Sequence, residues 1–199
     1  GHKHLENNNN FDIPSDLEGL NLSNDVVVYA GTLANWVDYE LLIFLASNSP
    51  DITFLLIGYI HPLAPKNEVN KLLDYTNVIH VGYKNYDELP SYYSLSSIGI
   101  IPYQSNNEHI RYSTPTKFLD YFSAGLQTVS TDFPAAYAYD KEFVKIASSK
   151  QAFLDLLLNG LQDIDKERSD RIRFYAKDHS WDNQVKKMYK LINQAEDLD

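Results

Sequence analysis

The chain has 199 residues, 44% of them hydrophobic, and this length and composition predict one globular domain with a sizeable core. It contains no cysteine, which excludes a disulfide scaffold and a thiolate metal site, and no uncharged apolar run approaches the roughly 18 residues that span a bilayer. The formal net charge of −10 argues against a nucleic-acid-binding protein, because an acidic surface repels phosphate backbones. The absence of cysteine and of a visible secretory signal is consistent with a cytoplasmic protein.

The first 25 residues differ in character from the rest of the chain. Residues 1–10 are polar and aperiodic and end in four asparagines, so we interpret them as a tag remnant or a linker. Residues 11–25 contain turn-forming residues such as Pro14 and Gly19 and are interpreted as a connector. The folded domain is therefore expected over residues 26–199.

Short apolar runs recur along the next part of the chain and alternate with helical patterns. Six of them are predicted to be strands: Val26–Tyr29, Thr53–Ile57, Val78–Val81, Ile98–Pro102, Thr128–Thr131 and Val144–Ala147. The runs are largely apolar rather than alternating, which is typical of parallel strands buried on both faces. This arrangement predicts an α/β fold, a Rossmann-like doubly wound parallel sheet of about six strands flanked by helices.

Helix signals fall between and after these runs. Helices are predicted over Trp36–Ser47 (with Asn35 as N-cap), Asn67–Tyr75 and Pro90–Leu95. The clearest helix has Thr114 as its N-cap, Pro115 in the first helical position and Gly125 at its exit. Two further helices are expected to close the chain. The last would be capped by Ser180, with one face formed by Trp181, Val185, Met188 and Ile192.

In doubly wound sheets ligands bind beyond the carboxyl ends of the strands, so the residues that follow each strand are candidates. After the first strand, Gly31 lets the backbone approach a ligand closely, and Thr32 offers a hydroxyl and an amide to a phosphate. The alternative is a tight strand-to-helix turn with no ligand. Neither a G-x-G-x-x-G fingerprint nor a G-x-x-x-x-G-K-[ST] loop is present.

Further candidates follow the third and fourth strands. Gly82, Tyr83 and Lys84 come directly after the third strand, where Tyr83 either stacks on a base or packs as an ordinary surface tyrosine. Tyr103 follows the fourth strand and leads into a polar segment, residues 104–111, that is long for an α/β connection. Because long connections are often functional, Tyr103 is included among the candidates.

The predicted helix start at Ser113 and Thr114 is a candidate anion site, because first-turn amides and the helix dipole favour negative charge. Lys117 lies in this first turn, where a cation opposes the dipole by roughly 0.3–1 kcal/mol unless a negative ligand is also bound. Asp120 lies on the same face and can accept hydrogen bonds from ribose hydroxyls. The alternative is a surface ion pair between Lys117 and Asp120.

Several segments together resemble one enzyme family. They are Tyr29–Leu33, Trp36–Asp38, Asn77–Gly82, Tyr86–Pro90, His179–Trp181 and, most specifically, residues 115–125 with the sequence Pro-Thr-Lys-Phe-Leu-Asp-Tyr-Phe-Ser-Ala-Gly. In this order they are similar to the C-terminal, donor-binding domain of GT-B glycosyltransferases of group 1 (family-4-like). Bacterial enzymes that build capsular, teichuronic-acid or other surface polysaccharides are the most similar members. The resemblance runs from about Val26 to Ile192.

The resemblance implies a role for each candidate. Asp120 would bind the ribose, and the Gly82–Tyr83–Lys84 stretch would lie against the base. The diphosphate would be held by Lys117, the Ser113–Thr114 amides and the Gly31–Thr32 loop. The chain departs from the family pattern at two positions: Asp120 replaces the usual glutamate and is one methylene shorter, and Tyr112 stands where many retaining members carry an earlier acid.

The resulting hypothesis is the donor-binding half of a metal-independent glycosyltransferase of the hexosyltransferase type. It would move a sugar from a UDP- or GDP-linked nucleotide-sugar to a polysaccharide or lipid-linked acceptor, with Lys117 stabilising the departing diphosphate. No cofactor and no metal site are predicted. The alternatives are a nucleotide-sugar epimerase of the same fold and a non-catalytic nucleotide-sugar-binding module.

The family also places an N-terminal acceptor-binding domain before this one, and that domain is absent from this chain. We therefore expect the chain alone to be inactive. Any peripheral association with the inner face of the membrane is expected to run through the absent half.

Overall fold

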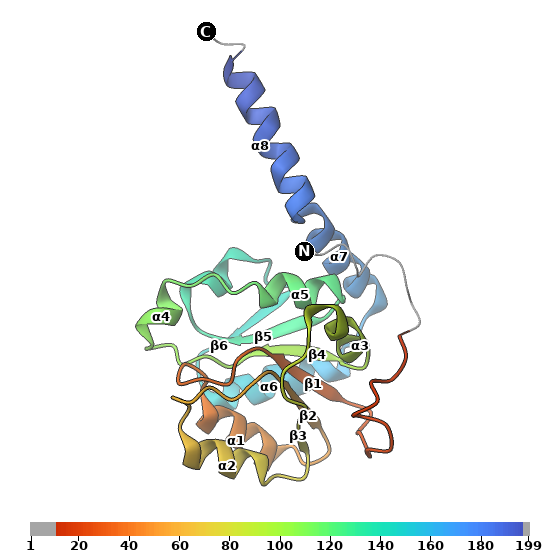
Figure 1. Cartoon of the computed structure of the whole chain (residues 1–199), viewed down its shortest axis with the longest axis vertical. Coiled ribbons are helices and arrows are strands. Elements are labelled where there is room, and N and C mark those ends of the chain that lie inside the picture. Colours follow the sequence, from red (N-terminus) through yellow and green to blue (C-terminus); the bar gives the residue numbers. More distant parts are fainter. Residues whose placement is uncertain (1–10, 197–199) are drawn as a thin grey trace.

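The computed structural model describes residues 11–196, except for the side chains of Trp181, Leu191 and residues 194–196. Residues 1–10, interpreted above as a tag remnant or linker, lie outside the described residues. The described chain forms an α/β domain from which the last helix projects (Figure 1).

Six parallel strands form one sheet with the spatial order β3-β2-β1-β4-β5-β6. The strands are β1 (Val26–Ala30), β2 (Thr53–Ile57), β3 (Val78–His80), β4 (Ile98–Ile101), β5 (Gln127–Thr131) and β6 (Val144–Ala147). The order reverses between β1 and β4, so the chain winds outward first to one edge of the sheet and then to the other. The predicted Rossmann-like, doubly wound sheet is confirmed.

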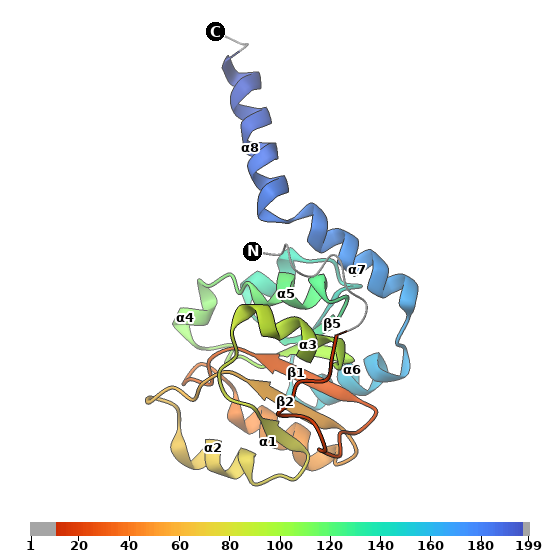
Figure 2. The same ribbon diagram turned by 45° about the vertical axis from the view of Figure 1, so that its right-hand side comes forward.

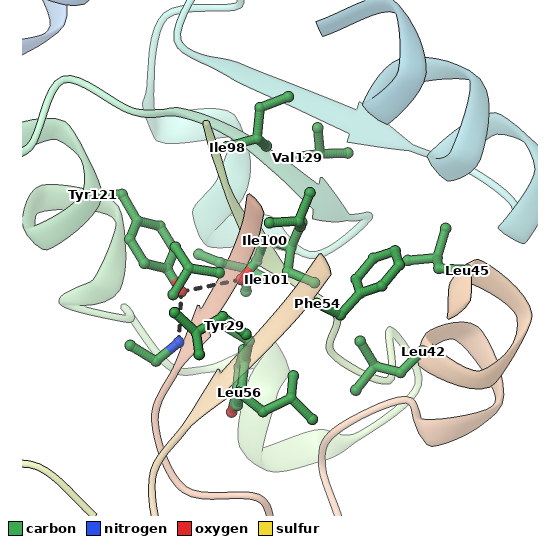
Figure 3. Close-up of a cluster of buried hydrophobic side chains, with 14 of the residues drawn as sticks. Tyr29, Leu42, Leu45, Phe54, Leu56, Ile98, Ile100, Ile101, Tyr121 and Val129 are labelled. Atoms are coloured by element: carbon green, nitrogen blue, oxygen red, sulfur yellow. Dashed lines mark hydrogen bonds between the residues drawn. The ribbon is translucent and has the colours of Figure 1, made fainter. Parts of the chain in front are cut away.

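Continuous burial explains why the strands were visible as apolar runs. Every residue of β1, β2, β4 and β5 is buried, because helices cover both faces of the sheet. Two predicted strands have the predicted bounds, and the other four differ by one residue at one end. Figure 3 shows side chains of β1, β2, β4 and β5 packed together with Leu42 and Leu45 of the first helix.

Helices lie on both faces of this sheet. The bounds are α1 (Tyr39–Asn48), α2 (Lys66–Leu73), α3 (Leu89–Ser94), α4 (Glu108–Arg111), α5 (Lys117–Ser123), α6 (Lys150–Gln162), α7 (Lys166–Asp178) and α8 (Trp181–Glu196). Helices α1, α2 and α6 contact one another on one face, whereas α5 and α7 pack together on the other, beside α3 (Figures 1 and 2). This second face brings α3 and α5 close to the carboxyl ends of the central strands.

The segment before β1 packs against the sheet. Leu17 is buried and its amide donates to the Pro14 carbonyl, which closes a turn. The Ser23 hydroxyl donates to the Asp25 carbonyl at 2.6 Å, and the Ser23 amide donates to the Thr53 hydroxyl at 2.9 Å. These bonds tie the segment to the start of β2.

Helix α1 begins three residues later than predicted, and its N-cap is Asp38 rather than Asn35. The Asp38 carboxylate accepts a hydrogen bond from the Leu41 amide at 2.8 Å. The preceding residues are not helical because Leu33 and Val37 form isolated bridges with Ile60 and Tyr103. These bridges and the turn at Asn35 and Trp36 between them keep the backbone out of a helix up to residue 37.

Helix α5 also begins later than predicted. Its first residue is Lys117 and its N-cap position is occupied by Thr116, so neither the Thr114 cap nor Pro115 at the first helical position is correct. The amide of Ser113 instead donates to the Ile110 carbonyl and so continues the turn that ends α4. The polar segment 104–111 therefore contains a short helix, α4, and residues 112–116, where α5 was expected to start, lie between the two helices.

Three helices, not two, follow the last strand. The last, α8, begins directly after Ser180 as predicted and extends away from the sheet in both views (Figures 1 and 2). Val185, Met188 and Ile192, predicted to share an apolar face, are 44%, 61% and 51% exposed. Within residues 11–196, no helix is long and apolar enough to cross a membrane.

Candidate functional site

A pocket of about 240 Å³ lies where the carboxyl ends of the central strands meet the start of α5. It is lined by the residues that end β1 and β2, by the loop after β3, by α3 and by the first turn of α5: Ala30, Gly31, Thr32, Ile57, Gly58, Tyr59, Tyr83, Lys84, Leu89, Tyr93, Thr116, Lys117 and Asp120. This position is the switch point of the sheet, where the connections from β1 and β4 depart to opposite sides and leave a crevice.

Two glycines make the floor of the pocket possible. A Cβ atom on Gly58 would lie 2.1 Å from the Gly31 carbonyl oxygen, and the φ of Gly58 is +139°. The Gly31 amide donates to the Ile57 carbonyl at 2.7 Å, and the Gly58 amide donates to the Gly82 carbonyl at 2.7 Å. Only glycine permits this close approach of the two strand ends.

Lys117 crosses the pocket from α5 to the end of β1. Its Cε would lie 2.3 Å from a Cβ on Gly31, so the lysine runs directly over the bare backbone. Its ammonium lies 5.7 Å from the ring centroid of Tyr29 and 5.6 Å from that of Tyr103, within the range of cation–π attraction. The two rings therefore stabilise the Lys117 ammonium beside the backbone of the loop that follows β1.

Tyr121 joins α5 to the two central strands. Its hydroxyl accepts a hydrogen bond from the Ala30 amide at 3.0 Å and donates to the Ile100 carbonyl at 3.3 Å (Figure 3). The β1–β4 register is formed only at Val27 and Val28, so the hydroxyl bridges the strands where their ladder has ended. Complete burial raises the pKa of the Tyr121 phenol, which therefore stays protonated and able to donate.

The Tyr121 ring fits because Gly99 of β4 has no side chain. A Cβ on Gly99 would lie 2.5 Å from the ring. Tyr93 of α3 packs edge-on against the same ring, with centroids 5.6 Å apart, and lines the pocket. Beneath the polar surface of the pocket there is therefore a buried layer of tyrosines.

Asp120 lies on the α5 side of the pocket and is only 9% exposed. Its Oδ1 atom accepts a hydrogen bond from the Tyr86 hydroxyl at 3.0 Å. Tyr86 comes from the 3₁₀ turn Tyr86–Glu88 after β3. Burial and the negative charge of Asp120 raise the pKa of Tyr86, because both oppose formation of a phenolate there.

The loop after β3 supplies the remaining wall. Tyr83 is 67% exposed, and Lys84 forms an ion pair with Asp16 at 2.6 Å. The hydrogen bond from Lys84 to Asp16 raises the pKa of the lysine, although partial burial opposes this shift. The Tyr92 hydroxyl donates to the same Asp16 carboxylate at 2.8 Å. Asp16 therefore binds the segment before β1 to the pocket wall.

The pocket gathers six of the ten candidates named from the sequence: Gly31, Thr32, Tyr83, Lys84, Lys117 and Asp120. Tyr103 is 3% exposed and lies behind Lys117 instead of lining the pocket. Gly82, Ser113 and Thr114 are also not among the lining residues. Because α5 starts at Lys117, Thr116 takes the place that was predicted for Ser113 and Thr114.

Seven lining residues were not among the candidates named from the sequence: Ala30, Ile57, Gly58, Tyr59, Leu89, Tyr93 and Thr116. Tyr59 directly follows Gly58 at the end of β2, so the strand-end rule that selected Gly31 would have selected it as well. Tyr93 had no such signal. It reaches the pocket only because α3 packs on the same face of the sheet as α5.

Titratable side chains elsewhere do not gather into a metal site: among residues 11–196, no group of three or more His, Asp or Glu residues is placed to hold an ion. Asp163 and Asp165 form an Asp-x-Asp pattern, but Asp163 pairs with Arg168 at 2.7 Å and Asp165 caps α7. His80 bonds the Gly58 carbonyl through Nε2 at 2.7 Å.

The fold and the position of this pocket define a class of protein. The chain superposes on sucrose-phosphate synthase from Thermosynechococcus elongatus with a TM-score of 0.66 and 16% identity, covering 95% of this chain and 50% of that one. Anabaena Alr3699/HepE, solved in complex with UDP and glucose, gives a TM-score of 0.64 and 15% identity, covering 85% and 48%. The domain is thus the Rossmann-like half of a GT-B architecture.

The family follows from the sequence itself. The model of the family described as "Glycosyl transferases group 1" matches residues 24–163, and the chain belongs to this family. A Bacillus subtilis (strain 168) protein described as a candidate teichuronic acid biosynthesis glycosyltransferase, TuaH, is 31% identical over 123 residues, which cover 60% of this chain and 30% of that protein. The chain therefore spans less than a third of this relative and about half of the two solved structures.

Proposed function

We propose that this chain binds the nucleotide-sugar donor of a group 1 glycosyltransferase that transfers a hexose to a polysaccharide or lipid-linked acceptor. The observation that carries the proposal is the pairing, in one pocket, of a cation and an acid one turn apart on α5. Lys117 lies over the glycine backbone at the end of β1, and Asp120 lines the same pocket from the α5 side. A cation attracts a diphosphate, and a carboxylate accepts hydrogen bonds from ribose hydroxyls.

The chemistry follows from where negative charge develops. As the bond from the anomeric carbon to the diphosphate breaks, charge accumulates on the leaving phosphate oxygens. In this proposal the Lys117 ammonium and the first amides of α5 stabilise that charge, and the Thr32 hydroxyl and amide add hydrogen bonds. The proposal requires no metal ligand and no cofactor from the described residues.

The nucleoside would lie toward the loop after β3. Tyr83 is exposed there and can stack on a base, while the Asp120 carboxylate accepts from the ribose hydroxyls. The UDP bound in the Anabaena protein supports a uridine nucleotide as the first donor to test, with GDP as the alternative. The Bacillus relative supports a surface polysaccharide as the acceptor class.

The acceptor site belongs, in this proposal, to sequence beyond this chain, because the chain spans only part of its relatives. We expect this chain to bind nucleotide without transferring sugar. A thermal-shift screen against UDP, GDP, ADP, CMP and their sugars identifies the base, since a ligand that binds the folded state raises the melting temperature.

Calorimetry on Asp120→Ala tests the ribose contact. The loss of a hydrogen bond to a charged group costs about 1.5–3 kcal/mol, which weakens UDP or GDP binding by roughly 10- to 150-fold. Asp132→Ala is the control, because Asp132 is exposed and lies outside the pocket. An unchanged dissociation constant for Asp120→Ala would show that Asp120 does not bind the ribose.

Lys117→Ala tests the diphosphate contact. The variant should weaken binding of the nucleoside diphosphate more than binding of the nucleoside, because only the former carries the charge that Lys117 attracts. Lys141→Ala, at an exposed position outside the pocket, should leave both affinities unchanged. Equal losses for both ligands contradict the assigned role.

A further inference from the structure

The hydrogen bond between Tyr86 and Asp120 joins two segments that are far apart in the sequence. The Tyr86 hydroxyl donates to Asp120 Oδ1 at 3.0 Å across 34 residues. Tyr86 is not among the residues that line the pocket, whereas Asp120 is. The bond to the Asp120 carboxylate therefore connects Tyr86 to the pocket.

The turn that carries Tyr86 is held in place by its own hydrogen bonds. Glu88 Oε2 accepts from both the backbone amide and the side-chain amide of Asn85 at 2.8 Å, and the Glu88 amide donates to the Asn85 carbonyl at 3.0 Å. This capping box fixes the turn Tyr86–Glu88, which leads directly into α3. The backbone that carries the Tyr86 side chain is therefore held before any ligand arrives.

The Asp120 carboxylate benefits from such a partner. A carboxylate has about four acceptor positions, and the Tyr86 hydroxyl occupies one of them and restrains the orientation of the Asp120 side chain. A side chain held in one rotamer loses less conformational entropy when it binds, which raises affinity.

We propose that Tyr86 is a positioning residue for nucleotide binding, whose hydroxyl holds the Asp120 carboxylate in the rotamer that accepts from the ribose hydroxyls. This inference rests on the proposed function. The opposite role, in which Tyr86 competes with the ribose for Asp120, predicts the opposite sign for the same substitution.

The test compares Tyr86→Phe with the wild-type chain by calorimetry, using whichever of UDP and GDP binds more tightly. The variant keeps the ring and removes only the hydroxyl, and we expect binding to weaken about 3- to 10-fold, the effect of one hydrogen bond. With the 2′,3′-dideoxy form of the same nucleotide the two proteins should bind equally. In an Asp120→Ala background, Tyr86→Phe should have no further effect.

Tyr137→Phe is a matched control. The Tyr137 hydroxyl also donates to an aspartate, Asp132 Oδ1, at 3.0 Å, but this pair is exposed and lies outside the pocket. The control variant should bind the nucleotide as the wild type does, and both variants should keep the wild-type melting temperature within about 2 °C, as expected when a partly exposed hydroxyl is removed.

Unchanged or tighter nucleotide binding by Tyr86→Phe overturns the inference, and so does an equal loss with the dideoxy nucleotide, which would reveal a purely structural role. Different outcomes would contradict the proposed function itself. If the wild type binds neither UDP nor GDP, or if Asp120→Ala leaves the affinity unchanged, the site assignment falls and this inference falls with it.

Discussion

Two hollows on this domain differ in size and in what they are made of. The larger, of about 660 Å³, lies along α7 and is lined by Phe143, Glu167, Asp170, Arg171, Phe174, Tyr175, Asp178 and His179. All of these but Phe143 belong to α7 or directly follow it. The smaller, of about 240 Å³, draws on five separate segments that meet at the switch point of the sheet.

The comparison shows that volume alone does not locate a site. The smaller pocket brings a lysine, a nearly buried carboxylate and bare glycine backbone together, and each is held by other residues. The larger hollow has an apolar lining and several of its charged groups already pair locally, such as Arg171 with Glu142. Polar groups that converge from several elements are the better sign of ligand binding.

The largest effect is expected when the glycine floor is filled. Gly58→Ala places a Cβ against the Gly31 carbonyl at a φ of +139°, and strain plus overpacking should lower the free energy of unfolding by about 2–6 kcal/mol. Gly82→Ala is the control, because its φ is +69° but no atom lies within 4 Å of the added carbon. The control should lose only about 1–2 kcal/mol. Urea unfolding of both variants measures the difference.

High pH should destabilise the domain through the buried tyrosines beneath the smaller pocket. Burial raises the pKa values of Tyr29, Tyr93 and Tyr121 beneath the pocket, so their stabilising contribution is complete below pH 10 and is lost as pH rises above it. At pH 11, each phenol that ionises only after unfolding costs about 1.4 kcal/mol, or about 4 kcal/mol for the three. Urea titrations at pH 8 and pH 11 measure this loss. Equal stability at both values would contradict the buried tyrosine layer.

A smaller effect is expected from Tyr121→Phe. This substitution keeps the ring over Gly99 but removes the hydroxyl between the Ala30 amide and the Ile100 carbonyl, leaving buried polar groups without that partner. The free energy of unfolding should fall by about 1–3 kcal/mol, against little change for the exposed Tyr137→Phe. The alkaline destabilisation at pH 11 should also be smaller in this variant by about 1.4 kcal/mol, the contribution of one buried phenol, which tests the preceding prediction independently.

The smallest effect is expected in the larger hollow. Phe174 is 74% exposed, so Phe174→Ser should change the free energy of unfolding by no more than about 0.5 kcal/mol and leave UDP or GDP affinity unchanged. Calorimetry on this variant checks the choice between the two hollows. A marked loss of nucleotide affinity would move the site from the strand ends to α7.

Much of the fold could be predicted because buried strands have a recognisable residue composition. A strand covered on both faces must be apolar at consecutive positions, and all six strands were found within one residue of their bounds. Helix starts were less predictable. Both Asn35 and Thr114 have the chemistry of an N-cap, yet the bridges at Leu33 and Val37 and the turn at Ser113 decide that α1 and α5 begin later.

The candidate site was predictable to the extent that it follows strand ends. Gly31, Thr32, Tyr83 and Lys84 directly follow strands, and Lys117 and Asp120 lie one helical turn apart, so local spacing was enough to select them. Tyr93 and Tyr86 could not be selected in this way, because their positions depend on how α3 and the turn before it pack beside α5.

The sequence by itself determined the α/β class, the six parallel strands and the edge of the sheet at which ligands are expected, because these depend on periodicity and on the order of elements. Only the tertiary structure decided that Gly58 underlies Gly31, that the Tyr121 hydroxyl bridges the separating strands, and that Tyr86 holds Asp120. These contacts join residues from 21 to 91 positions apart. No local sequence pattern predicts contacts between residues so far apart in the chain, since these contacts are set by the packing of whole elements on the sheet.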